Sequence, residues 1–551
     1  MTMKVVIVGG VAGGAGAAAR LRRNDEQAEI ILLERGRYIS FANCGLPYYI
    51  GGLIEDEAEL LLHTPESFHA RIGADVRVRH EVTAVDPARR TVRITRLDEG
   101  TEYEETYDKL ILSPGARAVR PPIQGTEQPH VFVLRNMEGC QALHAFIQTR
   151  TPRSAAVIGA GFIGVEMVEN LHRKGLSVTL IEAAPHVMGA LDQDMAAAVH
   201  NHIRSKGVNL VLDAKAEAVT ENAVRLADGR SFPADLVLIG AGVIPDTGFL
   251  RSSGIELGER GEILVNERQE TSLPDVLAVG DAVSVRHIVT GRKQLVSLAA
   301  PAAKQARIAA DVVCGLDAAY AGAQGTAIAK VFDMSVALTG LGEEALARTD
   351  LPWQKAVTIS PSHAGYYPGA TPVTIKVLFH PETGKLYGAQ AVGFEGVDKR
   401  LDVLATALRA GMTVLDLQDL ELAYAPPFSS SKDPVNIAGY VAGNMLSGRS
   451  KMIHAEDLHA GNATLLDIRT VEECGEGMIP GSISIPLHEL RDRLSELDKA
   501  RPVFVICQVG LRGHVGTEIL RHAGFTVSNL MGGYAFYKDY ETDRQARTRP
   551  S

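Results

Sequence analysis

GAGFIG, residues 159–164, stands between two apolar runs, Ser154–Ile158 and Ser177–Ile181. The pattern predicts a strand, a tight glycine turn, a helix and a second strand, which is the order of a dinucleotide-binding unit. The glycines make the turn, let backbone N–H groups approach a pyrophosphate, and let the helix pack closely on the strand. Glu182 ends the second strand, where its carboxylate would accept hydrogen bonds from the adenosine ribose and repel a 2′-phosphate. The unit therefore predicts binding of NADH in preference to NADPH.

A weaker copy of this unit begins the chain. Lys4–Val8 predicts a strand, GGVAGG at residues 9–14 predicts a glycine turn, and Glu29–Leu33 predicts a second strand that ends at Glu34. Val11 takes the place of the middle glycine, so a small-residue helix packed on a sheet is the alternative interpretation. Two such units about 150 residues apart indicate one resident and one diffusing dinucleotide.

Three further segments support the two units. Lys109–Leu112 predicts a buried strand that leads into a small-residue loop, Ser113-Pro114-Gly115. Asp235–Gly242 repeats this design in the second unit. Val276–Ala282 predicts a strand that ends in Gly-Asp, which would place Asp281 on the ribityl chain of a flavin.

This combination resembles the flavoproteins that bind two dinucleotides, the pyridine nucleotide–disulfide oxidoreductases, over about residues 1–445. The resemblance implies an α/β fold with two interleaved Rossmann-like domains, one for FAD (residues 1–115 and 245–324) and one for NAD(H) (residues 116–244). It also implies FAD and NADH as cofactors, with NADPH as an alternative. The residues expected to bind these cofactors are Gly9, Val11, Ala12, Gly13, Gly14, Glu34, Arg35, Asn43, Val82, Ser113, Pro114, Gly115, Gly159, Gly161, Phe162, Ile163, Gly164, Glu182, Gly242, Gly280 and Asp281.

The composition changes after residue 325. Strand-like segments such as Thr374–Phe379 precede a proline-rich stretch at Ala425-Pro426-Pro427. In the family this position holds an α+β dimerisation domain, here residues 325–447, which implies a homodimer. A polar junction, Gly448–Ile453, precedes a separate pattern that resembles an α/β rhodanese domain over residues 455–545.

Cys44 lies in SFANCGLPY, residues 40–48, where the family places a redox cysteine beside the flavin. The next cysteine is Cys140, so Cys44 cannot close a local disulfide and must cycle as a single thiol through a mixed disulfide, a persulfide or a sulfenate. The string is similar to that of coenzyme A–disulfide reductases. NADH peroxidases and oxidases are single-cysteine relatives that keep a histidine near position 10, whereas this chain has none before His63. This difference favours sulfur chemistry over peroxide chemistry.

Basic residues end the first predicted helix. Arg20, Arg22 and Arg23 cluster there, and Arg71 follows later in the sequence. Their positive charges could simply favour the C-terminal end of a helix, or they could bind the phosphates of coenzyme A. The coenzyme A–binding residues that we expect are Gly16, Arg20, Arg23, Ser40, Asn43 and Arg71.

Two tyrosines complete the expected site by resemblance. Tyr366 and Tyr424 belong to the predicted dimerisation domain, and in the family such tyrosines reach the redox cysteine of the other subunit. A phenol can hydrogen-bond a thiolate and protonate a leaving thiolate.

Cys507 begins CQVGLR, directly after the apolar run Val503–Ile506. A strand, a Cys-x4-Arg loop ending at Arg512 and a helix would surround one sulfur with backbone N–H groups, lower the pKa of the thiol and hold a persulfide. The other three cysteines, Cys140, Cys314 and Cys474, have no such context and are interpreted as structural.

Composition limits the remaining possibilities. The chain has 551 residues and a net charge of −10, which argues against a nucleic-acid surface. Its five cysteines show no zinc spacing, so no metal is expected and a reduced, cytoplasmic protein is predicted. No apolar stretch is long enough for a membrane span.

The sequence thus predicts an FAD-dependent NADH oxidoreductase that reduces coenzyme A persulfide or polysulfide, and to a lesser extent coenzyme A disulfide, through Cys44. Cys507 in the rhodanese domain would take up or deliver sulfane sulfur, and the enzyme would release sulfide. An NADH oxidase or peroxidase, and a sulfur carrier with a redox-sensing flavin domain, are the alternatives.

Overall fold

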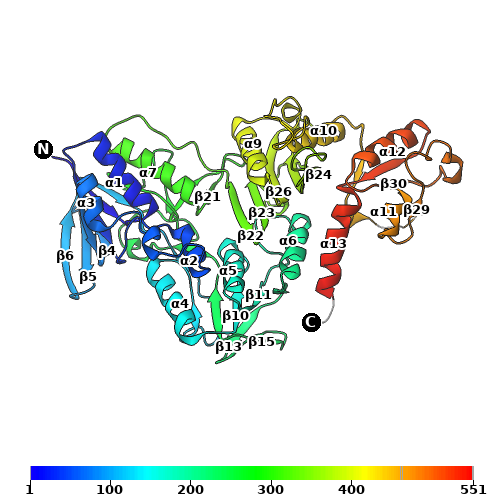
Figure 1. Ribbon diagram of the computed structural model, residues 1–551. Coiled ribbons are helices and arrows are strands. Elements are labelled where there is room, and N and C mark those ends of the chain that lie inside the picture. The colour runs from blue at the N-terminus through cyan, green and yellow to red at the C-terminus, as the bar shows by residue number, and fades with distance from the viewer. Residues whose placement is uncertain (1, 459–460, 462, 549–551) are drawn as a thin grey trace. The chain divides into compact units, whose positions relative to one another are not determined.

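The computed structural model describes residues 2–458, 461 and 463–548 (Figure 1). The chain divides into two compact units. Unit 1 contains the chain up to Ala183 together with Asp213–Gly325, and unit 2 contains Ala184–Leu212 together with the chain from Thr326 onward.

The first parallel sheet of unit 1 has the strand order β19-β7-β1-β2-β3. Its strands and the two helices that pack on it are β1 (Lys4–Val8), β2 (Glu29–Glu34), β3 (Asp75–Val78), β7 (Lys109–Leu112), β19 (Val276–Ala278), α1 (Ala12–Asn24) and α7 (Ala299–Val313). Alternate residues of β1 enter opposite cores, Val6 and Val8 one and Val5 and Ile7 the other. A parallel strand buried on both faces reads as a continuous apolar run, which is why KVVIV lacks alternation.

A second parallel sheet in unit 1 carries the stronger glycine motif. Its strands and helices are β9 (Val131–Phe132), β10 (Ser154–Ile158), β11 (Ser177–Ile181), β16 (Leu236–Ile239), α4 (Met137–Arg150) and α5 (Phe162–Arg173). The strands β11, β10, β16 and β9 follow one another in parallel. Because β19 and α7 return to the first sheet after this second one, the predicted interleaving of two Rossmann-like folds is confirmed.

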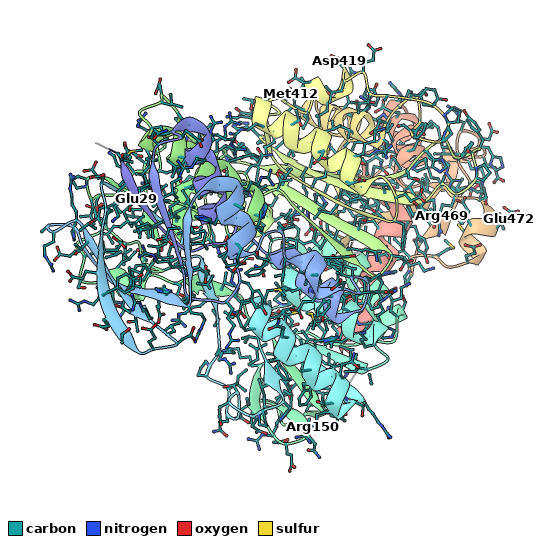
Figure 2. All side chains as sticks on the ribbon, turned by 60° about the vertical axis from the view of Figure 1, so that its left-hand side comes forward. Glu29, Arg150, Met412, Asp419, Arg469 and Glu472 are labelled. Atoms are coloured by element: carbon teal, nitrogen blue, oxygen red, sulfur yellow. The ribbon has the colours of Figure 1, made fainter. Side chains whose placement is uncertain are left out.

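Shorter elements complete unit 1. The helical ones are η1 (Asn43–Gly45), α2 (Leu46–Ile50), η2 (Glu57–Leu60), α3 (Pro65–Ile72) and η3 (Gly248–Leu250). The strands are β4 (His80–Asp86), β5 (Thr91–Arg96), β6 (Thr101–Thr106), β8 (Ala116–Ala118), β13 (Ala216–Val219), β14 (Ala223–Leu226), β15 (Ser231–Pro233), β17 (Val243–Pro245), β18 (Ile263–Leu264), β20 (Val283–Arg286) and β21 (Lys293–Leu295). Figure 2 shows Arg150 at the exposed end of α4.

Unit 2 contains an antiparallel sheet with the order β22-β23-β26-β25-β24. Its elements are β22 (Ala327–Val331), β23 (Met334–Gly340), β24 (Gln354–Pro361), β25 (Pro372–Phe379), β26 (Leu386–Gly393), α8 (Glu343–Ala347), α9 (Val397–Ala410), η4 (Asp416–Gln418) and α10 (Pro434–Leu446). Helix α9 packs on β23 and β26, and α10 packs on β24 and β25. This is the α+β architecture that we predicted for residues 325–447.

The C-terminal part of unit 2 is a parallel sheet with the order β27-β31-β30-β28-β29. Its elements are β27 (Met452–Ile453), η5 (Ala455–Asp457), β28 (Thr464–Asp467), α11 (Val471–Gly475), β29 (Ile483–Ser484), η6 (Leu494–Glu496), β30 (Val503–Ile506), α12 (Leu511–His522), β31 (Val527–Leu530) and α13 (Gly533–Thr548). The predicted C-terminal α/β fold is therefore confirmed. Among the described residues, no helix is long and apolar enough to cross a membrane.

One segment of the predicted NAD(H) domain packs with unit 2. Helix α6 (Gln193–Ser205) and strand β12 (Asn209–Val211) lie within residues 116–244, yet α6 packs on α13 of the C-terminal part and on β23 and β26. The sequence motifs at Gly159 and Glu182 contain no information about this packing. The exact domain limits remain predictions.

Candidate active sites

The first glycine loop has the geometry that a dinucleotide requires. Gly9 has φ +96°, and a Cβ there would lie 2.0 Å from the Ser113 carbonyl oxygen. A Cβ at Gly14 would lie 1.8 Å from the Gly9 carbonyl oxygen, so α1 packs closely on the turn. The Gly10 N–H donates to Glu34 Oε2 at 2.7 Å. The Val11 side chain has no acceptor for the first N–H groups of α1, which leaves them for a pyrophosphate. These residues fit FAD.

The second glycine loop repeats this geometry. Gly159 has φ +101°, and a Cβ at Gly164 would lie 2.0 Å from the Gly159 carbonyl oxygen. Gly161, which precedes α5, has open space where its Cβ would be. The Ala160 N–H donates to Glu182 Oε2 at 2.6 Å. The same contact between turn and acid therefore forms in both loops, although only the second has the full glycine pattern. These residues fit a nicotinamide dinucleotide.

The other predicted cofactor residues lie mainly in loops at these sheets. Gly115, Gly242 and Gly280 all have positive φ. The Gly280 N–H donates to the buried Gln305 side chain at 2.7 Å, a partner that the sequence did not indicate. Val82 packs in the hydrophobic core, where it cannot be distinguished from an ordinary core residue. Contact of these residues with a cofactor stays a prediction.

Arg35 is a predicted cofactor residue that already has partners. Its guanidinium forms an ion pair with Asp246 at 2.6 Å and lies 3.9 Å from Glu81.

Cys44 lies in the short turn η1, and its residue is exposed. In the amide orientation that satisfies both atoms, Asn43 donates to the Arg135 carbonyl oxygen at 3.0 Å and accepts from the Arg135 guanidinium at 2.9 Å. Arg135 also donates to Asp281 Oδ2 at 2.8 Å and to the Ala116 carbonyl oxygen at 2.9 Å. Arg135 thus links two predicted site residues, and no sequence signal pointed to it.

Charged groups of both signs act on Cys44. Partial burial of the sulfur raises the pKa of the Cys44 thiol, Glu166 and Asp281 raise it further, and Arg135 lowers it. Glu166 lies on α5, and Tyr48 Oη donates to its carboxylate at 3.3 Å. Burial and this carboxylate raise the pKa of Tyr48 to about 12. Tyr48 stands inside SFANCGLPY and Glu166 two residues after GAGFIG, so both were within reach of sequence analysis.

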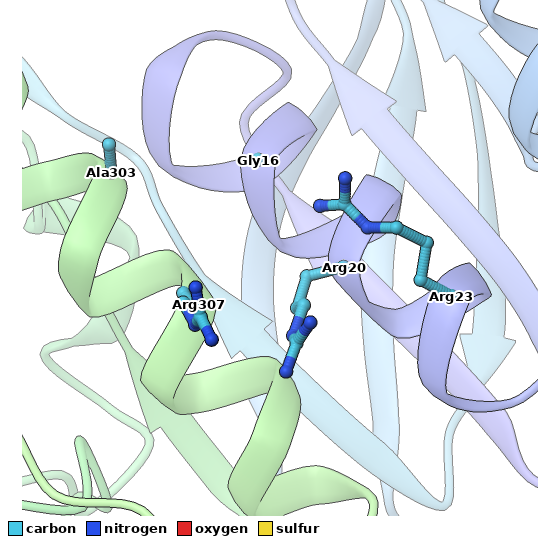
Figure 3. A pocket seen from close by; sticks show the side chains of 5 residues that line it. All are labelled: Gly16, Arg20, Arg23, Ala303 and Arg307. Carbon is cyan, nitrogen blue, oxygen red and sulfur yellow. The ribbon is translucent and has the colours of Figure 1, made fainter.

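A basic cavity of 350 Å³ lies between α1 and α7. Three of its lining residues were predicted, Gly16, Arg20 and Arg23 on α1, and Figure 3 shows them facing Ala303 and Arg307 of α7. Arg20 Nε donates to Asp311 Oδ1 at 2.6 Å, and Arg307 Nε lies 3.9 Å from Asp311 Oδ2, so one carboxylate holds two of the three guanidinium groups. The cavity therefore presents a cluster of positive charge suited to phosphates. Arg307 was missed because α7 follows α1 by nearly 300 residues.

The remaining basic residues and predicted coenzyme A residues lie elsewhere. Arg22 donates to backbone carbonyls, among them those of Ile72 at 2.7 Å and Ala28 at 2.8 Å, so it is a structural residue of unit 1. Arg71 is exposed on α3 and does not line the cavity. Ser40, with φ +48°, donates its backbone N–H to the Gly10 carbonyl oxygen at 2.9 Å.

The structure brings Tyr366 and Tyr424 together in unit 2. Their hydroxyl oxygens are 3.2 Å apart, and this hydrogen bond raises the pKa of Tyr366. Tyr366 is 76% and Tyr424 is 49% exposed, so both phenols are available at the surface of their own unit. Their approach to Cys44 remains a prediction.

Cys507 lies at the end of β30, and its loop leads into α12 as predicted. Gly510, in a left-handed conformation with φ +102°, donates its N–H to Cys507 Sγ at 3.0 Å. Burial raises the pKa of the Cys507 thiol more than backbone N–H groups and Arg512 lower it. The expectation of a lowered pKa was therefore wrong, because Cys507 is only 1% exposed and desolvation outweighs the N–H dipoles.

Ion pairs fix the Cys507 loop. Arg512 Nη1 donates to Glu473 Oε2 at 2.7 Å, and this pairing lowers the pKa of Glu473 to about 2. Arg469 (Figure 2) donates to the Gln508 side chain of this loop at 3.3 Å, pairs with the buried Asp467 at 2.8 Å and lies over the Tyr534 ring. Arg512 was predicted from the Cys-x4-Arg spacing, whereas Glu473 lies 34 residues before Cys507 and had no motif to mark it.

The chain matches three protein-family domains. "Pyridine nucleotide-disulphide oxidoreductase" matches residues 3–306, its "dimerisation domain" matches residues 326–434, and "Rhodanese-like domain" matches residues 451–539.

Several known proteins are similar to this chain over most of its length. The coenzyme A disulfide reductase of Staphylococcus haemolyticus is 38% identical over 80% of this chain and 99% of its own. The structure of reduced Bacillus anthracis CoADR-RHD is 46% identical with a TM-score of 0.97, covering 99% of each chain. The NAD-dependent persulfide reductase of A. fulgidus is 37% identical with a TM-score of 0.93, covering 97% of this chain and 100% of its own.

Proposed function

Because the chain belongs to the pyridine nucleotide-disulphide oxidoreductase family, we propose that it reduces coenzyme A persulfide or polysulfide with NADH, and coenzyme A disulfide to a lesser extent. The observation that carries the proposal is the pairing of two different thiols in one chain. Cys44 is exposed and would cycle without a second cysteine, while Cys507 lies in a loop whose Gly510 N–H donates to its sulfur and could hold a single sulfane sulfur. The similarity to a coenzyme A disulfide reductase and to an NAD-dependent persulfide reductase supports this choice of substrates.

The family implies FAD and a nicotinamide dinucleotide. We assign FAD to the loop at Gly9–Gly14 and NADH to the loop at Gly159–Gly164. When both are bound, they supply two electrons to the sulfur chemistry at Cys44.

The chain's own residues perform the sulfur chemistry. The Cys44 thiolate attacks one sulfur of the substrate, a Cys44–sulfur bond forms, the sulfur–sulfur bond breaks, and a thiolate or HS⁻ leaves. Tyr366 or Tyr424 donates a proton to the leaving group. Two electrons then cleave the Cys44–sulfur bond. Overall, one persulfide, one NADH and one proton give one thiol, one H₂S and one NAD⁺.

The cavity between α1 and α7 is the proposed site for the phosphates of coenzyme A. Arg20, Arg23 and Arg307 bring guanidinium groups to one place, and guanidinium is the side chain best suited to bidentate phosphate contacts. The pantetheine arm would carry the reacting sulfur away from these phosphates toward Cys44.

The proposed enzyme is a homodimer, consistent with the match to a dimerisation domain. Each site would combine Cys44 of one subunit with the two tyrosines of the other.

NADH preference follows from Glu182. A carboxylate beside the ribose hydroxyls repels the 2′-phosphate of NADPH. Glu182→Arg should raise kcat/KM for NADPH relative to NADH by at least tenfold. A wild-type protein that already prefers NADPH would contradict this assignment.

The test of the proposed function measures sulfide release and NADH loss together. With coenzyme A persulfide, the two rates should be equal, and removal of oxygen should leave them unchanged. NADH loss that depends on oxygen and yields no sulfide would instead support an NADH oxidase. Sulfur transfer without any NADH loss would support a sulfur carrier.

A further inference from the structure

Helix α13 of the C-terminal domain packs along α6, and Figure 1 shows the two helices side by side. Arg204 of α6 donates to Asp543 Oδ1 at 2.7 Å. Asn201 donates to the Asp539 carbonyl oxygen at 2.9 Å. Asp543 is only 3% exposed, so its carboxylate is enclosed between the helices and depends on these partners. The rhodanese fold is therefore attached to a helix whose sequence lies in the predicted NAD(H) domain.

His200 extends this contact to a loop. Its Nδ1 lies 3.0 Å from Asp543 Oδ2, and its Nε2 accepts the Val187 N–H at 3.1 Å. The ring is fully buried, and burial lowers the pKa of His200, which favours the neutral ring. Because Nε2 accepts a hydrogen bond, the ring proton of the neutral form is on Nδ1 and faces Asp543. One imidazole thus joins α13 to the backbone of the loop at Val187.

The far end of the same loop is also fixed. Asp192 accepts the Glu343 N–H at 2.7 Å and pairs with Lys376 at 2.8 Å, and its own N–H donates to Gln390 at 3.0 Å. Asp192, Asp194 and Glu343 lie close enough to hold a metal ion, but the ammonium of Lys376 contacts all three carboxylates. The cluster is an anchor made of ion pairs. The loop Ala184–Leu191 is therefore held by the dimerisation domain at one end and, through His200, by the rhodanese domain at its middle.

We propose that the rhodanese domain, through Asp543 and His200, holds the loop Ala184–Leu191 in the conformation that binds NADH. Val187 follows Glu182, the proposed ribose ligand, by five residues of one continuous loop. A loop that is already ordered loses less conformational freedom when a ligand binds, so its affinity is higher. Asp543 and His200 are positioning residues, since they act through the loop. The inference rests on the proposed function only in assigning NADH to the second glycine loop.

The coupling is reciprocal. If docking of α13 strengthens dinucleotide binding, then dinucleotide binding must strengthen docking of α13 by the same factor. In the wild-type protein, saturating NAD⁺ should therefore slow hydrogen exchange at the backbone amides of α13. This measurement needs no substitution and no turnover.

The variant test uses Asp543→Asn in the full-length protein. It keeps the shape of the side chain and removes the charge that faces His200 and Arg204. We expect the Kd for NAD⁺, measured by calorimetry, and the KM for NADH to rise by about fivefold or more, with kcat at saturating NADH within about twofold of wild type. Glu541→Gln is the matched control, because Glu541 is on the same helix and, among the residues that the structure describes, pairs with Arg544 and Gln545 of that helix.

The outcomes are distinct. An unchanged Kd in Asp543→Asn, or no effect of NAD⁺ on exchange in α13, would overturn the inference. Equal increases of the Kd for NAD⁺ in Asp543→Asn and Glu541→Gln would also overturn the inference, because the effect would then not pass through His200. Failure to reduce persulfide, with NAD⁺ affinity still dependent on Asp543, would reject the proposed substrates and leave this coupling intact.

Discussion

Cys44 and Cys507 are the two thiols to which we assign chemistry, and their surroundings differ in kind. Cys44 lies in a short turn among ionisable side chains, with Glu166 and Asp281 opposing Arg135. Cys507 is 1% exposed, and its nearest polar contacts are backbone N–H groups. Side-chain charges change with pH and with the binding of charged ligands, whereas backbone dipoles do not. The first site is therefore suited to a thiol whose reactivity responds to its substrate, and the second to a thiol that holds one sulfur under constant conditions.

The largest expected effect separates the two thiols outright. Cys44→Ser should abolish reduction of coenzyme A persulfide and disulfide, because no second cysteine can replace it, while NADH still reduces the bound flavin. Cys507→Ser should leave coenzyme A disulfide reduction at the wild-type rate and impair only turnover in which sulfane sulfur passes through the rhodanese loop. Steady-state rates with both substrates, and anaerobic flavin reduction, measure this. Parallel loss of every activity in both variants would reject the division of roles.

The next largest effect concerns the proton donors proposed for Cys44. Tyr366→Phe combined with Tyr424→Phe should slow acceptor reduction by roughly 10²–10⁴-fold, the usual contribution of a general acid. Each single variant should cost less, because the hydroxyls are hydrogen-bonded to each other and one can substitute for the other. Flavin reduction by NADH should be unchanged.

Subunit mixing tests whether these tyrosines act across the dimer. Heterodimers of a Cys44→Ser chain and a double tyrosine variant contain one site with both lesions and one intact site. Activity should therefore return when the subunits exchange. Mixed subunits that have exchanged but remain as inactive as their parents would show that each site is formed within one chain.

The two glycine loops show which features of this fold could be predicted from the sequence. Both form the same turn, and both turns contact the acid at the end of the next strand, although Val11 breaks the pattern in the first. The motif succeeds because a strand, a turn and a helix are set by contiguous residues. Arg307 and Arg135 had no such local signal, since their partners lie far away in the sequence.

The error at Cys507 has a different origin. The loop motif correctly predicted backbone N–H groups around the sulfur. The direction of the pKa shift depends on how completely the surrounding domain excludes water, which no short motif contains. The packing of α6 on α13 was missed for the same reason, because it joins segments more than 300 residues apart.

A smaller effect on sulfur uptake is expected when the Cys507 loop is changed. Arg512→Met removes a cation that lowers the pKa of Cys507 and leaves Glu473 without its ion pair. Sulfur uptake by Cys507 at pH 7 should fall by about tenfold, because a higher pKa of the Cys507 thiol leaves less of the reactive thiolate. The rate of sulfur transfer from a small persulfide donor to Cys507, in a Cys44→Ser background, measures this uptake. Arg493→Met is the control, since Arg493 pairs with Glu489 and Glu496 elsewhere in this domain.

The ion pair of Glu473 also makes the stability difference between wild type and Arg512→Met depend on pH. Its pKa is lowered to about 2 in the folded protein, so its ion pair stabilises the fold above the ordinary glutamate range. That stabilisation is lost as pH falls toward 2. The Tm difference between wild type and Arg512→Met should therefore be present at pH 7 and shrink between about pH 4.5 and 2. A constant difference would contradict the pairing.

The smallest effect tests whether side-chain charge controls Cys44. Glu166→Gln removes an anion that raises the pKa of the Cys44 thiol, so that pKa should fall. The rate of alkylation by iodoacetamide follows the thiolate, and its pH profile should shift to lower pH accordingly. Arg135→Met should shift the profile in the opposite direction, because it removes the cation that lowers the pKa of Cys44.

Both variants are measured without NADH in a background lacking Cys314, Cys474 and Cys507. Glu57→Gln is the control, since that carboxylate raises the pKa of the buried Cys140 instead. If Glu166→Gln and Arg135→Met shift the profile in the same direction, or neither differs from Glu57→Gln, then Cys44 is governed by burial alone and its contrast with Cys507 disappears.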